Sequence, residues 1–95
     1  MSFHIECRRW FQKSVGNTYH SVYIFKDGEC IGKVPYEYGY GTHCLQTAFE
    51  WLCSEDFIYN VKRNNNGTLE KPLWQYFQSI QASTSIIDVA RKQDL

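Results

Sequence analysis

Three histidines and four cysteines are the side chains of this sequence that are best suited to chemistry. His4, His20 and His43 titrate near neutral pH, so two of them beside a tyrosine or lysine would support acid–base phosphodiester chemistry. The other catalytic arrangement is a cysteine nucleophile, Cys30 or Cys44, beside His20 or His43. Nothing in the spacing brings these groups within hydrogen-bonding distance, and we expect a protein without enzymatic activity.

The spacing of the cysteines does not indicate a metal site. No pair follows the CxxC pattern, and Cys44 and Cys53 lie on opposite faces of a predicted helix that turns about 100° per residue. His43 and Cys44 are adjacent and do not easily ligate one tetrahedral zinc ion. We therefore expect no metal and no cofactor, and cysteines that are reduced, small and apolar in character.

The stretch YEYGYGTH, residues 36–43, leads directly into a predicted helix. Gly39 and Gly41 free the backbone there, and the N–H groups at a helix N-terminus form an anion site. The stretch contains neither GxxxxGK[ST] nor GxGxxG, the patterns of common nucleotide sites. Two interpretations stay open: the glycines only permit a bend while the tyrosines cover a sheet edge, or the stretch contacts a ligand or partner. Its candidate binding residues are Tyr36, Tyr38, Gly39, Tyr40, Gly41, Thr42 and His43.

Basic and aromatic residues cluster near the N-terminus, in Arg8-Arg9-Trp10-Phe11 and at Lys13. With the tyrosines of the chain, they are compatible with stacking on single-stranded nucleic acid. Ten basic and ten acidic residues give a formal net charge of zero, which argues against nucleic-acid binding driven by bulk charge. We expect the arginine stems to cover apolar surface, and Trp10 and Phe11 to lie in the core.

Length and composition predict a single small domain, residues 1–95, with one modest core. Hydrophobic residues make up 43% of the chain and aromatic residues 17%, and large rings help a short chain to fill its core. No apolar run approaches the ~20 residues of a membrane span. The segment MSFHIECRRWF lacks a signal-peptide pattern, so we expect a cytoplasmic protein without a membrane partner.

Hydrophobic periodicity and turn signals predict an α+β fold, an antiparallel three- to four-stranded sheet with two helices packed on one face. Asp27-Gly28 is a hairpin turn, Pro35 ends the third strand, and Thr42 caps the first helix. The predicted strands are residues 3–11, 18–26, 29–35 and 84–90, with an optional strand at residues 57–61, and the predicted helices are residues 43–54 and 72–82.

The turn also predicts a register for the hairpin, with Lys26 opposite Glu29, Phe25 opposite Cys30, Ile24 opposite Ile31 and Tyr23 opposite Gly32. One side of the hairpin then carries aliphatic residues, which suit a face covered by helices. The other side carries tyrosines and Phe25. This tyrosine side is either exposed or covered by the C-terminal part of the chain, and the pattern does not decide between the two.

Two pieces of the sequence carry a resemblance, RRWFQKSVGNTYHSVYIFKDGE and YEYGYGTHCLQTAFEWL. Together they resemble a family of small phage and prophage proteins with an RRWF…GNTYHSV hairpin and a YGYG-helix segment. The resemblance covers roughly residues 3–53, and the tail SIIDVARKQDL is similar too. It implies a phage origin and a host cytoplasm, and it transfers no catalytic residue. Small phage accessory proteins of this kind commonly inhibit host functions or defence systems by binding.

We therefore expect a non-enzymatic binding protein whose partner is a host or defence protein. A nucleotide or nucleic acid held by the tyrosine-rich loop and Arg8-Arg9 is the alternative, and a homodimer is a further possibility. Aromatic rings and arginines are common energetic anchors of interfaces. The candidate surface combines the 36–43 stretch with His20, Tyr23, Arg8 and Arg9, with Tyr19 beside them.

Overall fold

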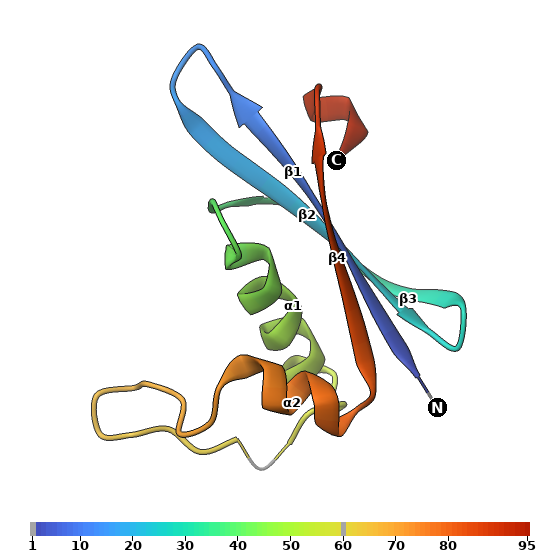
Figure 1. The fold of residues 1–95 in the computed structure, drawn as a ribbon, viewed down its shortest axis with the longest axis vertical. Helices are drawn as coiled ribbons and strands as arrows, with labels where there is room; N and C mark the ends of the chain where they lie inside the picture. Colours follow the sequence, from blue (N-terminus) through green and yellow to red (C-terminus); the bar gives the residue numbers. More distant parts are fainter. Residues whose placement is uncertain (1, 60) are drawn as a thin grey trace.

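Four strands form one twisted sheet in the order β3-β2-β1-β4 (Figure 1). The computed structural model describes residues 2–59 and 61–95. Its elements are β1 (Phe3–Gln12), β2 (Asn17–Lys26), β3 (Glu29–Tyr38), α1 (His43–Ser54), α2 (Leu73–Ser79), β4 (Ala82–Val89) and the short 3₁₀ helix η1 (Lys92–Asp94). The coarse prediction of an α+β fold with four strands and two helices is confirmed.

The β2–β3 hairpin closes at Asp27 and Gly28, whose φ angles of 52° and 86° are those that a tight hairpin turn requires. The predicted pairs of Lys26 with Glu29 and Phe25 with Cys30 are confirmed. Beyond them the register prediction is wrong, because an irregularity leaves Ile31 without an opposite residue. Ile24 therefore pairs with Gly32, and Tyr23 with Lys33.

The prediction that Pro35 ends the third strand is also wrong. β3 continues to Tyr38, with a second irregularity opposite Ser21. β3 is an edge strand, so a residue without an N–H group costs no bond to a further strand. The longer strand carries Tyr36 and Tyr38 onto the sheet, although the sequence placed them in a loop.

The sheet is mixed, which corrects the expectation of an antiparallel sheet. β1 and β2 pair antiparallel, as do β2 and β3, but β4 lies parallel to β1 with Phe3 opposite Ala82 and Trp10 opposite Val89. The chain between β3 and β4 contains both helices, and a crossover of this length allows a parallel neighbour. The periodicity of β4 contains no information about which strand it joins.

The predicted strand over residues 57–61 does not form in its described residues, and Asn60 lies outside them. The N–H groups of Phe57 and Ile58 both donate to the carbonyl of Leu52, at 2.9 and 3.3 Å. They close the C-terminal end of α1 and are not available to a sheet. Ile58 is nevertheless buried, so its apolar character reflects the core and not a strand.

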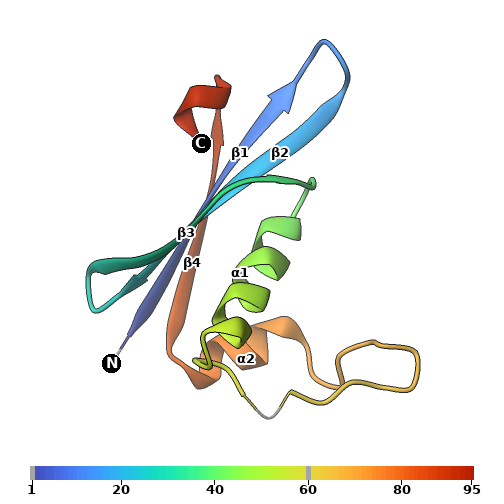
Figure 2. The ribbon, with the colours of Figure 1, turned by 180° about the vertical axis from the view of Figure 1, so that it is seen from behind.

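Helix α1 packs on the sheet through Cys44, Ala48, Phe49 and Leu52, which recur at helical spacing and are all buried. Their partners in the core include Ile5 and Cys7 of β1 and Val22 and Ile24 of β2. Helix α2 adds Tyr76, whose ring lies 5.3 Å from that of Phe49. Helix α2 is shorter than the predicted 72–82, because Gln81 adopts a left-handed conformation just before β4. Figures 1 and 2 show α1 and η1 on opposite sides of the sheet.

Candidate functional site

The face of the sheet opposite α1 collects most of the partly exposed aromatic rings of the strands. Strand side chains alternate between faces, so the neighbours of the buried residues Cys7, Val22 and Ile24 point away from α1. We call this surface the aromatic face, and define it by Trp10, Tyr19, Tyr23, Tyr36 and Tyr38 with the basic residues Arg8, Lys33 and Lys92.

The rings of the aromatic face form a row across three strands. Trp10 of β1 stacks on Tyr19 of β2 with ring centroids 5.9 Å apart, and Tyr19 stacks on Tyr36 of β3 at 4.8 Å with 14° between the planes. Neighbouring strands are spaced by about 4.8 Å, so rings stacked at that distance stand upright on the sheet. Tyr38 meets Tyr19 edge to face at 5.6 Å. The row therefore presents ring edges and hydroxyl groups to solvent.

Cationic side chains lie over the remaining ring faces. The guanidinium of Arg8 lies 4.6 Å and the ammonium of Lys33 5.1 Å from the centroid of Tyr23. Lys92 covers Tyr36 at 4.8 Å. Arg8 also forms an ion pair with Glu6 at 3.0 Å. These contacts combine polarisable rings with positive charge on a patch of a protein whose net charge is zero.

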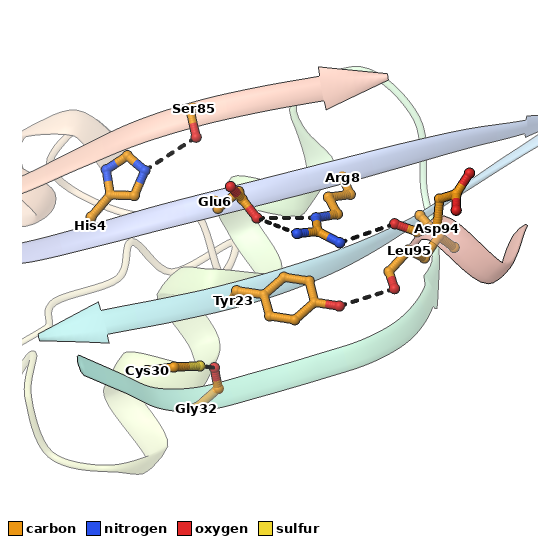
Figure 3. Close-up of polar contacts among 9 residues, drawn as sticks. All are labelled: His4, Glu6, Arg8, Tyr23, Cys30, Gly32, Ser85, Asp94 and Leu95. Carbon is orange, nitrogen blue, oxygen red and sulfur yellow. Dashed lines mark hydrogen bonds and ion pairs between the residues drawn. The ribbon is translucent and has the colours of Figure 1, made fainter. Parts of the chain in front are cut away.

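The C-terminal segment lies over the centre of the aromatic face (Figure 3). The hydroxyl of Tyr23 donates to the carbonyl of Leu95 at 3.0 Å, and Arg8 donates to the carbonyl of Asp94 at 3.2 Å. Ser21, between Tyr19 and Tyr23 in sequence, is fully buried, and its hydroxyl has no hydrogen-bond partner among the described residues. The sequence left open whether the tyrosine side of the hairpin is exposed or covered by the C-terminal part of the chain. In the structure η1 covers its middle, whereas Tyr36 and Tyr38 are 42% and 58% exposed.

The residues expected to form one surface are divided between the two faces. Arg8 and Tyr23 lie on the aromatic face, as do Tyr36 and Tyr38. Arg9, the neighbour of Arg8, points to the side of α1, where it binds Asp88. His20, His43 and the 39–42 loop also lie on or near the side of α1.

His20 is a buried structural histidine. Its Nδ1 donates to the carbonyl of Gly39 at 3.3 Å, and in the neutral ring its Nε2 accepts from the hydroxyl of Thr47 at 2.8 Å. Burial lowers the pKa of His20 below its ordinary value, and the carbonyl of Gly39 opposes that shift. The ring of His43 lies 5.5 Å away and is exposed. Both nitrogens of His20 are therefore occupied by partners that hold the loop and α1 to β2.

The remaining catalytic candidates have other surroundings. His4 bonds to Ser83 at 2.7 Å across the β1–β4 boundary. It also bonds to Ser85 at 3.2 Å (Figure 3). Cys30 is exposed on β3. Cys44 is buried against Cys7, whose thiol, through a hydrogen bond, lowers the pKa of Cys44, and Arg9 lowers it further. Over residues 2–59 and 61–95, no group of three metal-ligating side chains forms.

Backbone hydrogen bonds within the loop between β3 and α1 also help to hold it. The N–H group of His43 donates to the carbonyl of Tyr40 at 3.2 Å, and that of Leu45 to Thr42 at 2.9 Å. The predicted capping role of the Thr42 side chain is wrong, because Thr42 precedes α1 but makes no side-chain bond to it. Two of the N–H groups that an anion would need are therefore already in use. Gly39 is needed because a Cβ atom there would collide with the ring of His43.

Sequence reasoning missed part of the aromatic face. Trp10 and Phe11 were expected in the core, but Trp10 is half-buried in the ring row and Phe11 is exposed. The alternation of His4, Glu6 and Arg8 with buried residues continues through Trp10, and this signal places Trp10 on the face opposite α1. Lys92 carried no such signal, because its contact with Tyr36 depends on the path of the chain after β4.

Comparison of this chain with protein-family models, curated proteins and solved structures finds no match. The helices of the described segments are too short to cross a bilayer.

Proposed function

We propose that this chain is a non-enzymatic binding protein that recognises a protein partner through the aromatic face. In line with the resemblance of its sequence to phage proteins, we propose a phage-type accessory role in the host cytoplasm, with a host or defence component as the partner. The observation that supports recognition is the upright row of Trp10, Tyr19 and Tyr36, extended by Tyr38.

The chemistry of the row suits a protein interface. Tyrosine and tryptophan offer a large contact area at a low cost in conformational entropy, and arginine is enriched beside them at energetic hot spots. The rings hold one another in place. Tyr36, for example, contacts both the ring of Tyr19 and the ammonium group of Lys92. A partner would meet rings that are already ordered, which lowers the entropic cost of binding.

The arrangement of the helices favours this face over the other. We propose that both helices pack on the side of the sheet away from the aromatic face, as the core contacts of α1 and its contact with α2 support. The face of the sheet that contacts α1 is then buried in the hydrophobic core. The aromatic face contacts the short C-terminal segment.

Alanine variants of the rings test the proposal directly. Tagged protein is used to capture partners from a bacterial lysate, with Tyr36→Ala and Tyr38→Ala as the test variants. Tyr59→Ala is the matched control, because Tyr59 is exposed but does not contribute to the ring row. We expect the captured protein to be lost with Tyr38→Ala and retained with Tyr59→Ala. Retention with both ring variants, each folded by circular dichroism, would exclude this face.

The 36–43 loop has its own test. Tyr40 is the most exposed of the three tyrosines in the 36–43 stretch, and it does not contribute to the ring row. If the loop and not the sheet is the interface, Tyr40→Ala loses the partner while Tyr38→Ala keeps it. The opposite pattern supports the aromatic face.

A nucleic acid is the second candidate, favoured by the three cations on the aromatic face. Base stacking needs an open ring face, however, and the faces of Tyr19 and Tyr36 already contact other rings or Lys92. Binding to a single-stranded oligonucleotide that weakens steeply with salt would favour this candidate. No binding at low salt would remove it.

A further inference from the structure

Strand β4 is an outer strand of the sheet with an open edge. On its inner side it pairs with β1 through eight residues, Ala82–Val89, without a shift in register. Among the described residues, no backbone hydrogen bond joins Ala82–Val89 to a segment other than β1. The outer N–H and C=O groups of a strand in this position are free to pair with another strand.

The two edges of this sheet differ in how they are protected. β3, the other outer strand, carries Lys33 and Pro35 and has two irregularities in its register. Lysine, proline and bulges are the devices that keep an edge strand from pairing. β4 has the sequence ASTSIIDV, without lysine, proline or glycine. Only the β4 edge is therefore suited to continue the sheet.

The side chains and charge of β4 also suit contact with an identical strand. Ile86 and Ile87, on opposite faces, are 36% and 45% exposed. Asp88 is the only charged residue of the strand, and Arg9 binds its two carboxylate oxygens at 2.7 and 3.1 Å. Two copies of this edge would therefore meet without unpaired like charges, which would otherwise oppose association.

We propose that β4 pairs antiparallel with β4 of a second copy of this chain, which joins the two sheets into one continuous sheet around a two-fold axis. With the axis at Ile86, this side chain faces its own copy, and Ile87 faces Ser85. Such pairing is isologous and closes at the dimer, because the same edge is used on both subunits. It covers the open groups of β4 and the two exposed isoleucines in a single step.

The proposed contact is one pair of strands, which is smaller than a standard interface of about 1,600 Å². The dimer is therefore in equilibrium with the monomer over accessible concentrations. The contact is on the edge of the sheet and leaves the ring row on its face. Dimerisation and partner recognition through the aromatic face are thus separate, and either can fail without the other.

Sedimentation velocity of the full chain, from about 1 µM to about 1 mM, tests the proposal. We expect the mass to rise with concentration from 11.2 kDa to twice that value. Ile86→Lys and Ile87→Lys each place a charge on the edge from one face and should shift the dissociation constant at least tenfold towards monomer. Val15→Lys is the matched control, because Val15 is 59% exposed in the turn between β1 and β2, and it should associate like the wild type.

Hydrogen exchange distinguishes the β4 edge from other contacts. At high concentration, amides of Ala82–Val89 should gain protection, while those of Glu29–Tyr38 should not. Three results would overturn the proposal: a monomer at every concentration, an assembly larger than a dimer, or protection that appears at β3 instead of β4. Circular dichroism of each lysine variant shows that it is folded, so a loss of dimer reports on the edge.

Discussion

Arg9 holds Asp88 across the boundary of two parallel strands, with its Nε and one terminal nitrogen 2.7 and 3.1 Å from the two carboxylate oxygens. The other terminal nitrogen donates to the carbonyl of Gly41 at 2.9 Å. One side chain thus connects β1, β4 and the loop before α1. The hydrogen bond and nearby charge of Asp88 keep the pKa of Arg9 above its ordinary value, so Arg9 keeps its positive charge at any accessible pH.

Replacing Arg9 with glutamine should loosen the loop more than it destabilises the fold. Asp88 is largely exposed, and exposed ion pairs contribute only about 0.2–1 kcal/mol. The bond to Gly41 has no substitute, so the amides of the 40–43 segment should exchange at least several-fold faster. Arg8→Gln is the control, because Arg8 lies on the other face and pairs with Glu6. Equal exchange in both variants would show that Arg9 does not hold the loop.

Gly32 is required by the indole of Trp51. A Cβ atom at Gly32 would overlap the six-membered ring of Trp51, so Gly32→Ala must displace α1 or the tryptophan. We expect a loss of about 1–3 kcal/mol in the free energy of unfolding, the usual cost of overpacking. Urea denaturation measures it. In the Trp51→Leu background the same change should cost clearly less, and an equal cost in both backgrounds would point to a cause other than this contact.

The buried His20 predicts a loss of stability in acid. Burial lowers its folded pKa below the ordinary 6.5, so the unfolded chain binds more protons between the two values. The free energy of unfolding should therefore be highest above about pH 6.5 and fall as the pH drops through the folded pKa. Thermal denaturation from pH 8 to pH 5 measures this, and His20→Gln should flatten that part of the profile. A wild-type profile as flat as that of the variant would contradict the assignment.

The hydroxyl of Tyr23 fastens the C-terminal segment to the aromatic face. Tyr23→Phe removes the bond to Leu95 and should cost about 0.5–1.5 kcal/mol, the net value of one hydrogen bond. Amides of residues 92–95 should exchange faster, while those of β2 stay protected. Tyr38→Phe removes an exposed hydroxyl from the same face and should leave the segment unchanged. No difference between the two variants would mean that the Lys92 and Arg8 contacts suffice.

Local signals predicted the parts of this structure that depend on a few neighbouring residues. The Asp27-Gly28 turn, the start of the hairpin register and α1 at residues 43–54 all agree with the structure. A turn requires particular φ angles, and a helix face requires a fixed spacing of apolar residues. Both requirements can be read from adjacent positions.

Contacts between distant segments decided the rest of the candidate site. The edge position of β3 allowed Pro35 to lie within the strand, and this extension brought Tyr36 beside Tyr19. The path of the chain after β4 placed η1 over the aromatic face. The alternation along β1 did predict that Arg8 and Arg9 point to opposite faces of the sheet. The Arg-Arg-Trp cluster was nevertheless interpreted as one surface.

The sequence by itself determined the turn, the main helix and the alternation of each strand, because these depend on backbone preferences and on side-chain spacing within one element. Only the tertiary structure decided that β4 lies parallel to β1 and that Phe57 and Ile58 close α1 and do not form a strand. The physical reason is that strand pairing and helix closure use the same backbone N–H and C=O groups. Which partner each group finds depends on segments that are far apart in the chain.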